Sequence, residues 1–149
     1  MSPFASAGGG FLLAVLWFDL MFDVQALRRP PGPLPEHVLA SIASYYARVT
    51  TAARPMNRLV AAAMLGTLAA LVVELAEARS PAWVAWASLA LVLAAVTVAA
   101  LRTVPSAVRL GTRRDPPELQ SALARAVLAQ HLFCFGAVGA MLVLQLAAS

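Results

Sequence analysis

Four long apolar runs, separated by short polar segments, dominate the pattern of the chain. They lie at about residues 8–27, 56–76, 82–101 and 126–147. A helix of about 20 residues, rising about 1.5 Å per residue, crosses a hydrocarbon core of roughly 30 Å, so each run is long enough to span a membrane. The pattern predicts an all-α fold, a polytopic four-helix bundle that forms a single membrane domain over residues 1–149.

A second pattern follows the first run. Prolines cluster at residues 30–35 and end the first helix, and residues 36–53 then carry apolar side chains at roughly helical spacing. This amphipathic segment is either an interfacial helix or an inward extension of the second span. Pro55 removes a backbone donor and disfavours the α conformation at Arg54, and we expect a kinked continuation into the second span.

The last apolar run begins after a helix start signal. Asp115 is a plausible cap, and Pro116 and Pro117 follow it where proline is tolerated in the first turn. A helix from Pro117 to about Ala148 would be about 48 Å long. Its first turns are therefore expected to project out of the bilayer.

The arginines predict an orientation. They gather in the first and third connections, whereas residues 77–81 form a short, nearly neutral second connection, and both terminal segments lack basic residues. The arginines concerned are Arg28, Arg29, Arg48, Arg54, Arg58, Arg102, Arg109, Arg113, Arg114 and Arg125. Cytoplasmic loops carry the excess of basic residues, so we expect a multi-pass protein of the bacterial cytoplasmic (inner) membrane with both termini on the outer side.

Composition agrees with a lipid environment. The chain is 61% hydrophobic and only 12% charged, about half the charged fraction of an average soluble domain. Its net charge of +4 is explained by arginines at topological positions, so no nucleic-acid partner is expected. The single cysteine, Cys134, permits no internal disulfide.

Two carboxyl groups in the first run are the main functional clue. Asp19 and Asp23 lie four residues apart in FLLAVLWFDLMFDVQAL, on one helical stripe. An ionisable group in hydrocarbon costs roughly 2.5–3.5 kcal/mol on insertion scales, so a partner, a polar cavity or a proton is expected. Arg58 begins the second span at the level of Asp23, and we predict an ion pair between them. Asp19 lies about 6 Å deeper, where burial and its neighbour favour the protonated form and a proton-bearing role.

His131 is the second polar focus. It lies in the inner half of the last run and can approach the layer of Asp23 and Arg58. One interpretation is a convergent Asp, Arg and His cluster, with His131, Asp19 and Asp23 as candidate catalytic residues. The other is that His131 bonds a backbone or hydroxyl group and that the charged pairs only lock helix packing.

Further residues complete the candidate site. The candidate binding or ion-pair residues are Arg54, Asn57, Arg58 and Arg109. No HxxxH or ExxH motif occurs, and only one histidine lies at membrane level, so neither a metal nor a cofactor is expected.

A resemblance covers most of the chain. The run VPSAVRLGTRRDPPELQSALARAVLAQHLFCFGAVGAMLVLQL, from Val104, resembles the third loop and fourth helix of the anthrone-oxygenase-like family of small bacterial and fungal membrane proteins. FDVQAL in the first run is similar to that family's first helix. Ala107 departs from the pattern, which has an asparagine there. The matching positions are Pro105, Ser106, Arg109, Leu110, Asp115 and His131.

The resemblance implies a possible chemistry. Some fungal relatives take part in cofactor-free oxidation of aromatic anthrones, whereas most bacterial members have no established activity. In that setting His131 would resemble a general base, and Arg109 or Asn57 an anion stabiliser. The spacing itself reveals no aromatic pocket, although Phe18, Phe22, Phe133 and Phe135 could line one if their helices are adjacent.

Three functions remain open from the sequence. The first is a small integral membrane protein that binds or stabilises a lipid, an apolar ligand or a membrane-protein partner. The second is a cofactor-free, oxygenase-like enzyme acting on an apolar aromatic substrate. The third is a proton-linked transporter, which would have to be a homo-oligomer because four helices without an internal repeat do not form two alternating halves.

Overall fold

The computed structural model describes residues 3–27 and 32–148, and within them the chain is helical with no strand. Four helices are long and apolar enough to cross a membrane, which fits a multi-pass membrane protein. These helical segments are Pro3–Ala26, Pro55–Ala76, Ala82–Thr112 and Pro117–Ala147. Arg28, Arg29, Pro30 and Pro31 lie outside the described residues.

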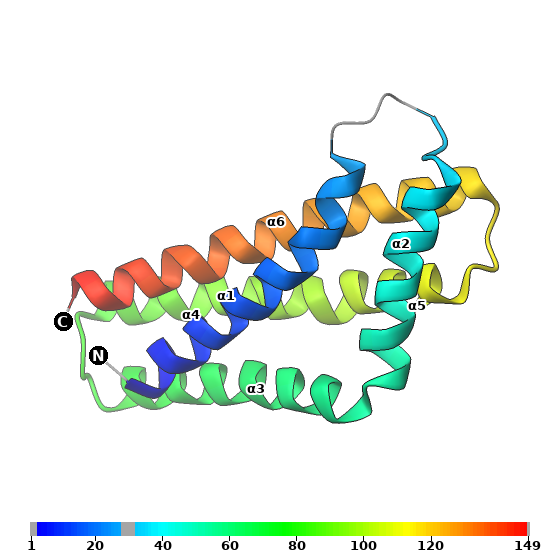
Figure 1. The fold of residues 1–149 in the computed structure, drawn as a ribbon. Coiled ribbons are helices and arrows are strands. Elements are labelled where there is room, and N and C mark those ends of the chain that lie inside the picture. The colour runs from blue at the N-terminus through cyan, green and yellow to red at the C-terminus, as the bar shows by residue number, and fades with distance from the viewer. Residues whose placement is uncertain (1–2, 28–31, 149) are drawn as a thin grey trace.

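The four long helices form a bundle in which each packs against two of the others. Helix α1 (Pro3–Asp23) and helix α4 (Ala82–Val98) each pack against α3 (Arg54–Ala76) and α6 (Pro117–Ala147). Figure 1 shows that α1 starts and α6 ends at the same end of this bundle. Buried apolar side chains of all four helices fill its centre, among them Leu12, Leu71, Val92, Val138 and Met141.

The third span is longer than its apolar run. Helix α4 continues through the π-helical turn η3 (Ala99–Thr103) directly into α5 (Val104–Thr112). Pro105 has no N–H to donate, and the wider π-helical turn immediately before it lets the chain pass the proline without leaving the helical path. The helix therefore carries Arg102 and Arg109 beyond residue 101, where the apolar run ends.

The amphipathic segment is a separate helix, not a kinked continuation of the second span. Helix α2 (Glu36–Tyr46) and the π-helical turn η2 (Ala47–Ala52) end at Ala53, which leaves the helical region with φ −88° and ψ 56°. Figure 1 shows the chain turning a corner there, so that α2 crosses the end of the bundle. Pro55 lies in the first turn of α3, where its missing N–H costs no hydrogen bond. A break at this corner therefore replaces the expected kink.

Helix α2 is held by a second apolar core at this end of the bundle. Val38, Leu39 and Ile42 on α2 are buried against Leu110 of α5 and Val127 of α6. The short η1 turn (Val24–Ala26) extends α1 into the same core through Ala26. Because α2 packs on α5, α6 and α1, its position is fixed relative to three helices at this end of the bundle.

Gly111 permits a close approach between α5 and the start of η2. A Cβ atom at this glycine would lie 2.8 Å from the backbone nitrogen and 3.0 Å from the Cα of Ala47. Both neighbours are main-chain atoms, so relief requires the two segments to move apart rather than a side chain to rotate.

Gly111→Ala should therefore loosen the contact between α5 and α2 and lower the free energy of unfolding by about 1–3 kcal/mol. Gly136→Ala is the matched control, since a Cβ at Gly136 on the exposed face of α6 meets no atom within 4 Å. Thermal unfolding of both purified variants in the same detergent measures the difference. Equal midpoints for the two variants would show that the close approach does not matter for stability.

Candidate functional site

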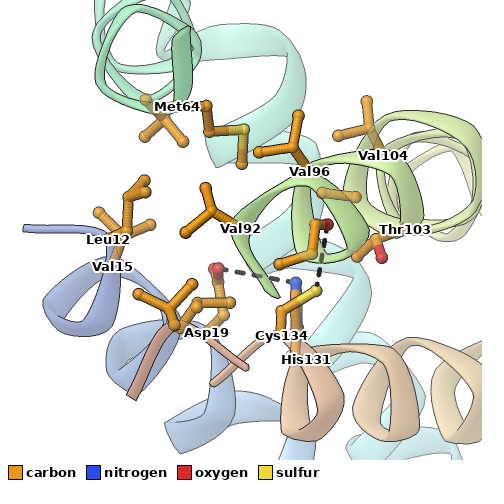
Figure 2. A pocket seen from close by; sticks show the side chains of 15 residues that line it. Leu12, Val15, Asp19, Met64, Val92, Val96, Thr103, Val104, His131 and Cys134 are labelled. Atoms are coloured by element: carbon orange, nitrogen blue, oxygen red, sulfur yellow. Dashed lines mark hydrogen bonds and ion pairs between the residues drawn. The ribbon is translucent and has the colours of Figure 1, made fainter. Parts of the chain in front are cut away.

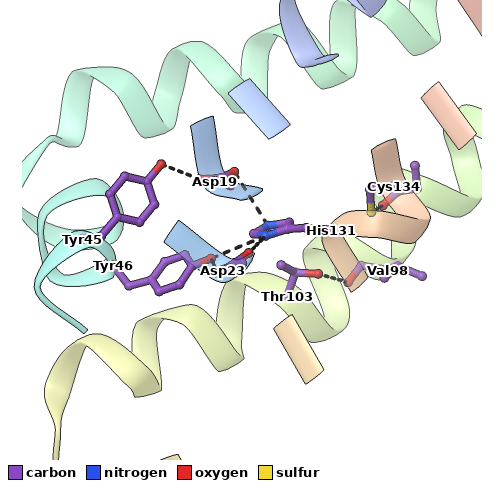
Figure 3. A network of polar contacts seen from close by, with 9 residues as sticks. Asp19, Asp23, Tyr45, Tyr46, Val98, Thr103, His131 and Cys134 are labelled. Carbon is purple, nitrogen blue, oxygen red and sulfur yellow. Dashed lines mark hydrogen bonds and ion pairs between the residues drawn. The ribbon is translucent and has the colours of Figure 1, made fainter. Parts of the chain in front are cut away.

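Five polar side chains from three helices meet at the α2 end of the bundle. Figure 3 shows Asp19 and Asp23 of α1, Tyr45 and Tyr46 of α2 and His131 of α6 pointing toward one another. Asp23, Tyr46 and His131 are buried, with 1%, 2% and 6% of their surface exposed. We call these five residues the Asp–Tyr–His cluster.

Asp23 is the centre of the cluster. Its Oδ1 accepts a hydrogen bond from the Tyr46 hydroxyl at 2.6 Å, and its Oδ2 lies 2.6 Å from Nδ1 of His131. A carboxylate can only accept, so the hydrogen of the second bond is on Nδ1. In the neutral imidazole, Nε2 is then left as an acceptor.

Asp19 is held in a similar way but faces a more open side. Its Oδ1 accepts from the Tyr45 hydroxyl at 2.6 Å, and the ring of Tyr45 is stacked on Phe22 with centroids 4.0 Å apart. Its Oδ2 lies 3.7 Å from Nε2 of His131, which is within ion-pair range but too long for a hydrogen bond. His131 thus lies between two carboxyl groups and bonds only one of them directly.

The predicted ion pair between Asp23 and Arg58 is not formed. Both oxygens of Asp23 are engaged by Tyr46 and His131, and Arg58 is exposed at the start of α3. The reason is the corner at Ala53: because α2 crosses the end of the bundle, it brings phenolic hydroxyls to the level at which arginine was expected.

The other candidate binding residues also lie away from the cluster. The Asn57 amide donates to the carbonyl oxygen of Thr50 at 2.7 Å and so braces the corner before α3. Arg109 forms a two-pronged ion pair with Asp115, at 2.7 and 2.8 Å, near the surface. The side chain of Arg54 lies outside the described part of the chain.

Sequence reasoning missed the two tyrosines as site residues. Their spacing placed them on the apolar face of an amphipathic helix, and both rings do pack there. The available signal was chemical, because a buried tyrosine hydroxyl usually requires a hydrogen-bond partner and one carboxyl group, Asp19, had no predicted partner. Which carboxylate meets which tyrosine depends on how α2 crosses α1.

A partly open cavity of about 120 Å³ adjoins the cluster. It lies between α1, α3, α4 with η3, and α6, and Figure 2 shows Asp19 and His131 at one side of it. Most of its wall is aliphatic, including Leu12, Met64, Val92, Val96 and Val138. The cavity is therefore an apolar space with a polar corner supplied by the cluster.

Two further polar side chains on the wall are already engaged with the backbone. The hydroxyl of Thr103 donates to the carbonyl oxygen of Val98 at 3.4 Å, and the thiol of Cys134 donates to that of Ala95 at 3.5 Å. Cys134 is buried in the bundle core.

No phenylalanine lines this cavity. Phe18 and Phe133 are 60% and 49% exposed on the outside of the bundle, Phe22 stacks on Tyr45, and Phe135 packs near Trp17. These four phenylalanines therefore do not form a pocket here, and the wall of this space is aliphatic. The helices turn these phenylalanines toward other neighbours because the inward stripe of α1 is occupied by Leu12, Leu16 and Asp19.

A second buried polar group lies on the same bundle. Glu74 of α3, Ser88 of α4 and Gln145 of α6 are each no more than 1% exposed. With its amide nitrogen facing the carboxylate, Gln145 donates to Glu74 at 3.1 Å and accepts from the Ser88 hydroxyl at 3.2 Å. Gln145 is about 21 Å along α6 from His131. The signal for this group in the sequence was Glu74, an ionisable residue inside an apolar run.

Comparisons with family models, with curated proteins and with solved structures found no match to this chain. The resemblance to the anthrone-oxygenase-like family therefore stays a prediction from the sequence.

The two tyrosines allow the cluster to be observed directly, because the chain contains no others. Burial, together with the neighbouring carboxylates, raises the pKa of both Tyr45 and Tyr46 well above the ordinary value. Folded protein at about pH 11 should thus show little tyrosinate absorbance, whereas unfolded protein ionises near pH 10. Because the folded state favours the neutral phenols, their contribution to stability is complete below about pH 10 and is lost as the pH rises further.

Spectrophotometric titration of folded and denatured protein makes this comparison. Tyr45→Phe and Tyr46→Phe assign the two steps, and Tyr46, which is more deeply buried, should ionise last. Ionisation of either tyrosine near pH 10 in the folded protein would contradict the cluster geometry.

Proposed function

We propose that this multi-pass membrane protein binds an apolar small molecule in the cavity beside the Asp–Tyr–His cluster. The observation that carries the proposal is an aliphatic space of about 120 Å³ with two ionisable side chains, Asp19 and His131, at one corner. Ligand sites are typically apolar walls with a few convergent polar groups. A cluster that served only helix packing would not need to border an empty space.

The size of the cavity limits the ligand. A cavity of about 150 Å³ lined by aliphatic and aromatic residues binds a single benzene ring, so the smaller space here accepts about one ring or a short branched chain. A longer molecule would place only its head in the cavity and leave its tail in the lipid. The bilayer is then both the surrounding solvent and the source of the ligand.

The charge distribution supports an orientation for this site. Arg48, Arg102, Arg109, Arg113 and Arg125 lie around α2, α5 and the start of α6, at the end of the bundle that holds the cluster. By the positive-inside rule this end, with α2, faces the cytoplasm of a bacterial inner membrane, and both termini face outward. The cluster then lies in the cytoplasmic half of the bilayer.

Filling the cavity should remove the ligand. Val96→Phe adds a ring to the cavity wall, whereas Leu93→Phe on the same helix adds it to a side chain that is 53% exposed on the outside. Native mass spectrometry of protein extracted with its own lipids should find a retained small molecule in the wild type and in Leu93→Phe, and none in Val96→Phe. A wild type that retains nothing, or equal retention by Val96→Phe, would argue against the site.

A second function, a proton-abstracting enzyme, is favoured by one specific feature of the cluster. Asp23 orients His131 through Nδ1, which leaves Nε2 as the basic nitrogen near the cavity. Nε2 could take a proton from an acidic C–H bond of a bound substrate, and the resulting carbanion could react with dissolved oxygen, as in an oxygenase-like reaction. No arginine reaches the cluster among the described residues, so the anion would have to be stabilised by the imidazolium formed at His131.

This enzyme reading predicts that His131→Gln loses oxygen consumption with a carbon acid of one ring, the size that the cavity admits, by about 10²-fold or more. The variant should still fold, because the glutamine amide can donate to Asp23 in place of the imidazole. Leu93→Phe serves as the control for expression and handling. Oxygen uptake that is unchanged in His131→Gln would remove the imidazole from the reaction.

A further inference from the structure

We propose that the cavity selects a hydroxyl donor, a phenol or quinol ring whose O–H bonds the Asp19 carboxylate, over quinones, ethers and hydrocarbons of the same size. The proposal deepens the proposed function, since it requires that the cavity binds a small molecule. It rests on an open acceptor, Asp19 Oδ2, at the polar corner of an aliphatic space.

The donors of the cluster are already engaged inside the protein. The hydroxyls of Tyr45 and Tyr46 donate to Asp19 and Asp23, each at 2.6 Å. The Nδ1 hydrogen of His131 points to Asp23 Oδ2 at 2.6 Å. None of these three hydrogens is available to a molecule in the cavity.

The remaining polar side chains on the wall are engaged in the same way. Thr103 and Cys134 direct their hydrogens to the carbonyl oxygens of Val98 and Ala95. These two groups can therefore offer only lone pairs to the cavity, and the hydroxyl oxygen is a stronger acceptor than the thiol sulfur.

One acceptor at the corner is left open. Within the described residues, no hydrogen bond reaches Asp19 Oδ2, since its distance of 3.7 Å from His131 Nε2 is too long for one. The Asp19 side chain keeps 15% of its surface exposed, compared with 0% for Asp23. Asp19 is thus the carboxyl group that a bound hydroxyl can reach.

The protein itself shows which donor suits these carboxylates. Both intramolecular bonds to Asp19 Oδ1 and Asp23 Oδ1 come from phenols at 2.6 Å, a length typical of strong O–H bonds to a charged oxygen. A ligand phenol at Asp19 Oδ2 would repeat this pairing on the second oxygen. One ring is also what a space of about 120 Å³ admits.

Ligands without a donor meet a penalty at the same corner. A quinone or ether would bring its own lone pairs toward those of Asp19, and a hydrocarbon would leave them unpaired. A site built to bond a hydroxyl rejects analogues that lack it, because its buried polar groups then lose their partner.

The test compares para-fluorophenol with para-fluorotoluene, in which a methyl group replaces the hydroxyl at nearly the same volume, and with para-fluoroanisole, which has an acceptor but no donor. Fluorine NMR measures binding of each probe to the full chain in phosphatidylcholine nanodiscs, with partition into empty nanodiscs subtracted. Signal that persists in Val96→Phe is counted as binding outside the cavity. We expect the phenol to bind at least about tenfold more tightly than either analogue.

Asp19→Asn provides the matched variant. The asparagine oxygen can still accept from Tyr45, but its NH₂ group places a donor at the corner, so the preference for the phenol should fall to less than about threefold. Because a change in folding could also lower binding, the comparison among the three probes on the wild type decides the proposal by itself.

The outcomes distinguish failure of the donor preference from failure of the binding site itself. Equal cavity binding of para-fluorophenol and para-fluorotoluene, or tighter binding of para-fluoroanisole, overturns the donor preference and leaves the binding site intact. If no probe shows binding that Val96→Phe abolishes, the cavity is not a ligand site and the proposed function fails together with the preference.

Discussion

The Asp23 carboxylate, bonded on one oxygen by Tyr46 and on the other by His131, is the interaction on which this end of the molecule depends. It joins α1, α2 and α6 at a point where Asp23 is 1% exposed. A buried charge is tolerated only with full hydrogen bonding, and removing one partner leaves an uncompensated group that costs several kcal/mol. The need to keep both oxygens of Asp23 hydrogen-bonded therefore holds the three helices together, in addition to their apolar contacts.

Hydrogen bonding of the carboxylates depends on α2 crossing the end of the bundle instead of continuing into the second span. The break at Ala53 frees α2 to cross the bundle end, and the absence of a side chain at Gly111 lets α5 approach the backbone at Ala47. The apolar face of α2 is then buried on α5 and α6 while its adjacent tyrosines reach different carboxylates. In this way α2 supplies both apolar side chains of the second core and the hydroxyls of the Asp–Tyr–His cluster.

Two networks of buried polar side chains in the bundle differ in what they adjoin. Glu74, Ser88 and Gln145 are enclosed between α3, α4 and α6, with the glutamine amide bridging the other two. Such a network fixes how the helices are aligned along one another. Apolar contacts alone do this poorly in a membrane, because lipid tails are as apolar as a neighbouring helix. The Asp–Tyr–His cluster borders an open volume instead, and the proposed binding function rests on this difference.

The sequence by itself determined that the chain is all-helical in the described residues, with four helices able to span a membrane, because apolar length and proline positions are local properties. It also singled out Asp19, Asp23 and His131, since ionisable groups in apolar runs stand out without any structure. Only the tertiary structure decided their partners. Whether Asp23 meets Arg58 or Tyr46 depends on the direction the chain takes at Ala53, and whether phenylalanines line the cavity depends on the rotation of each helix, which packing sets across the whole bundle.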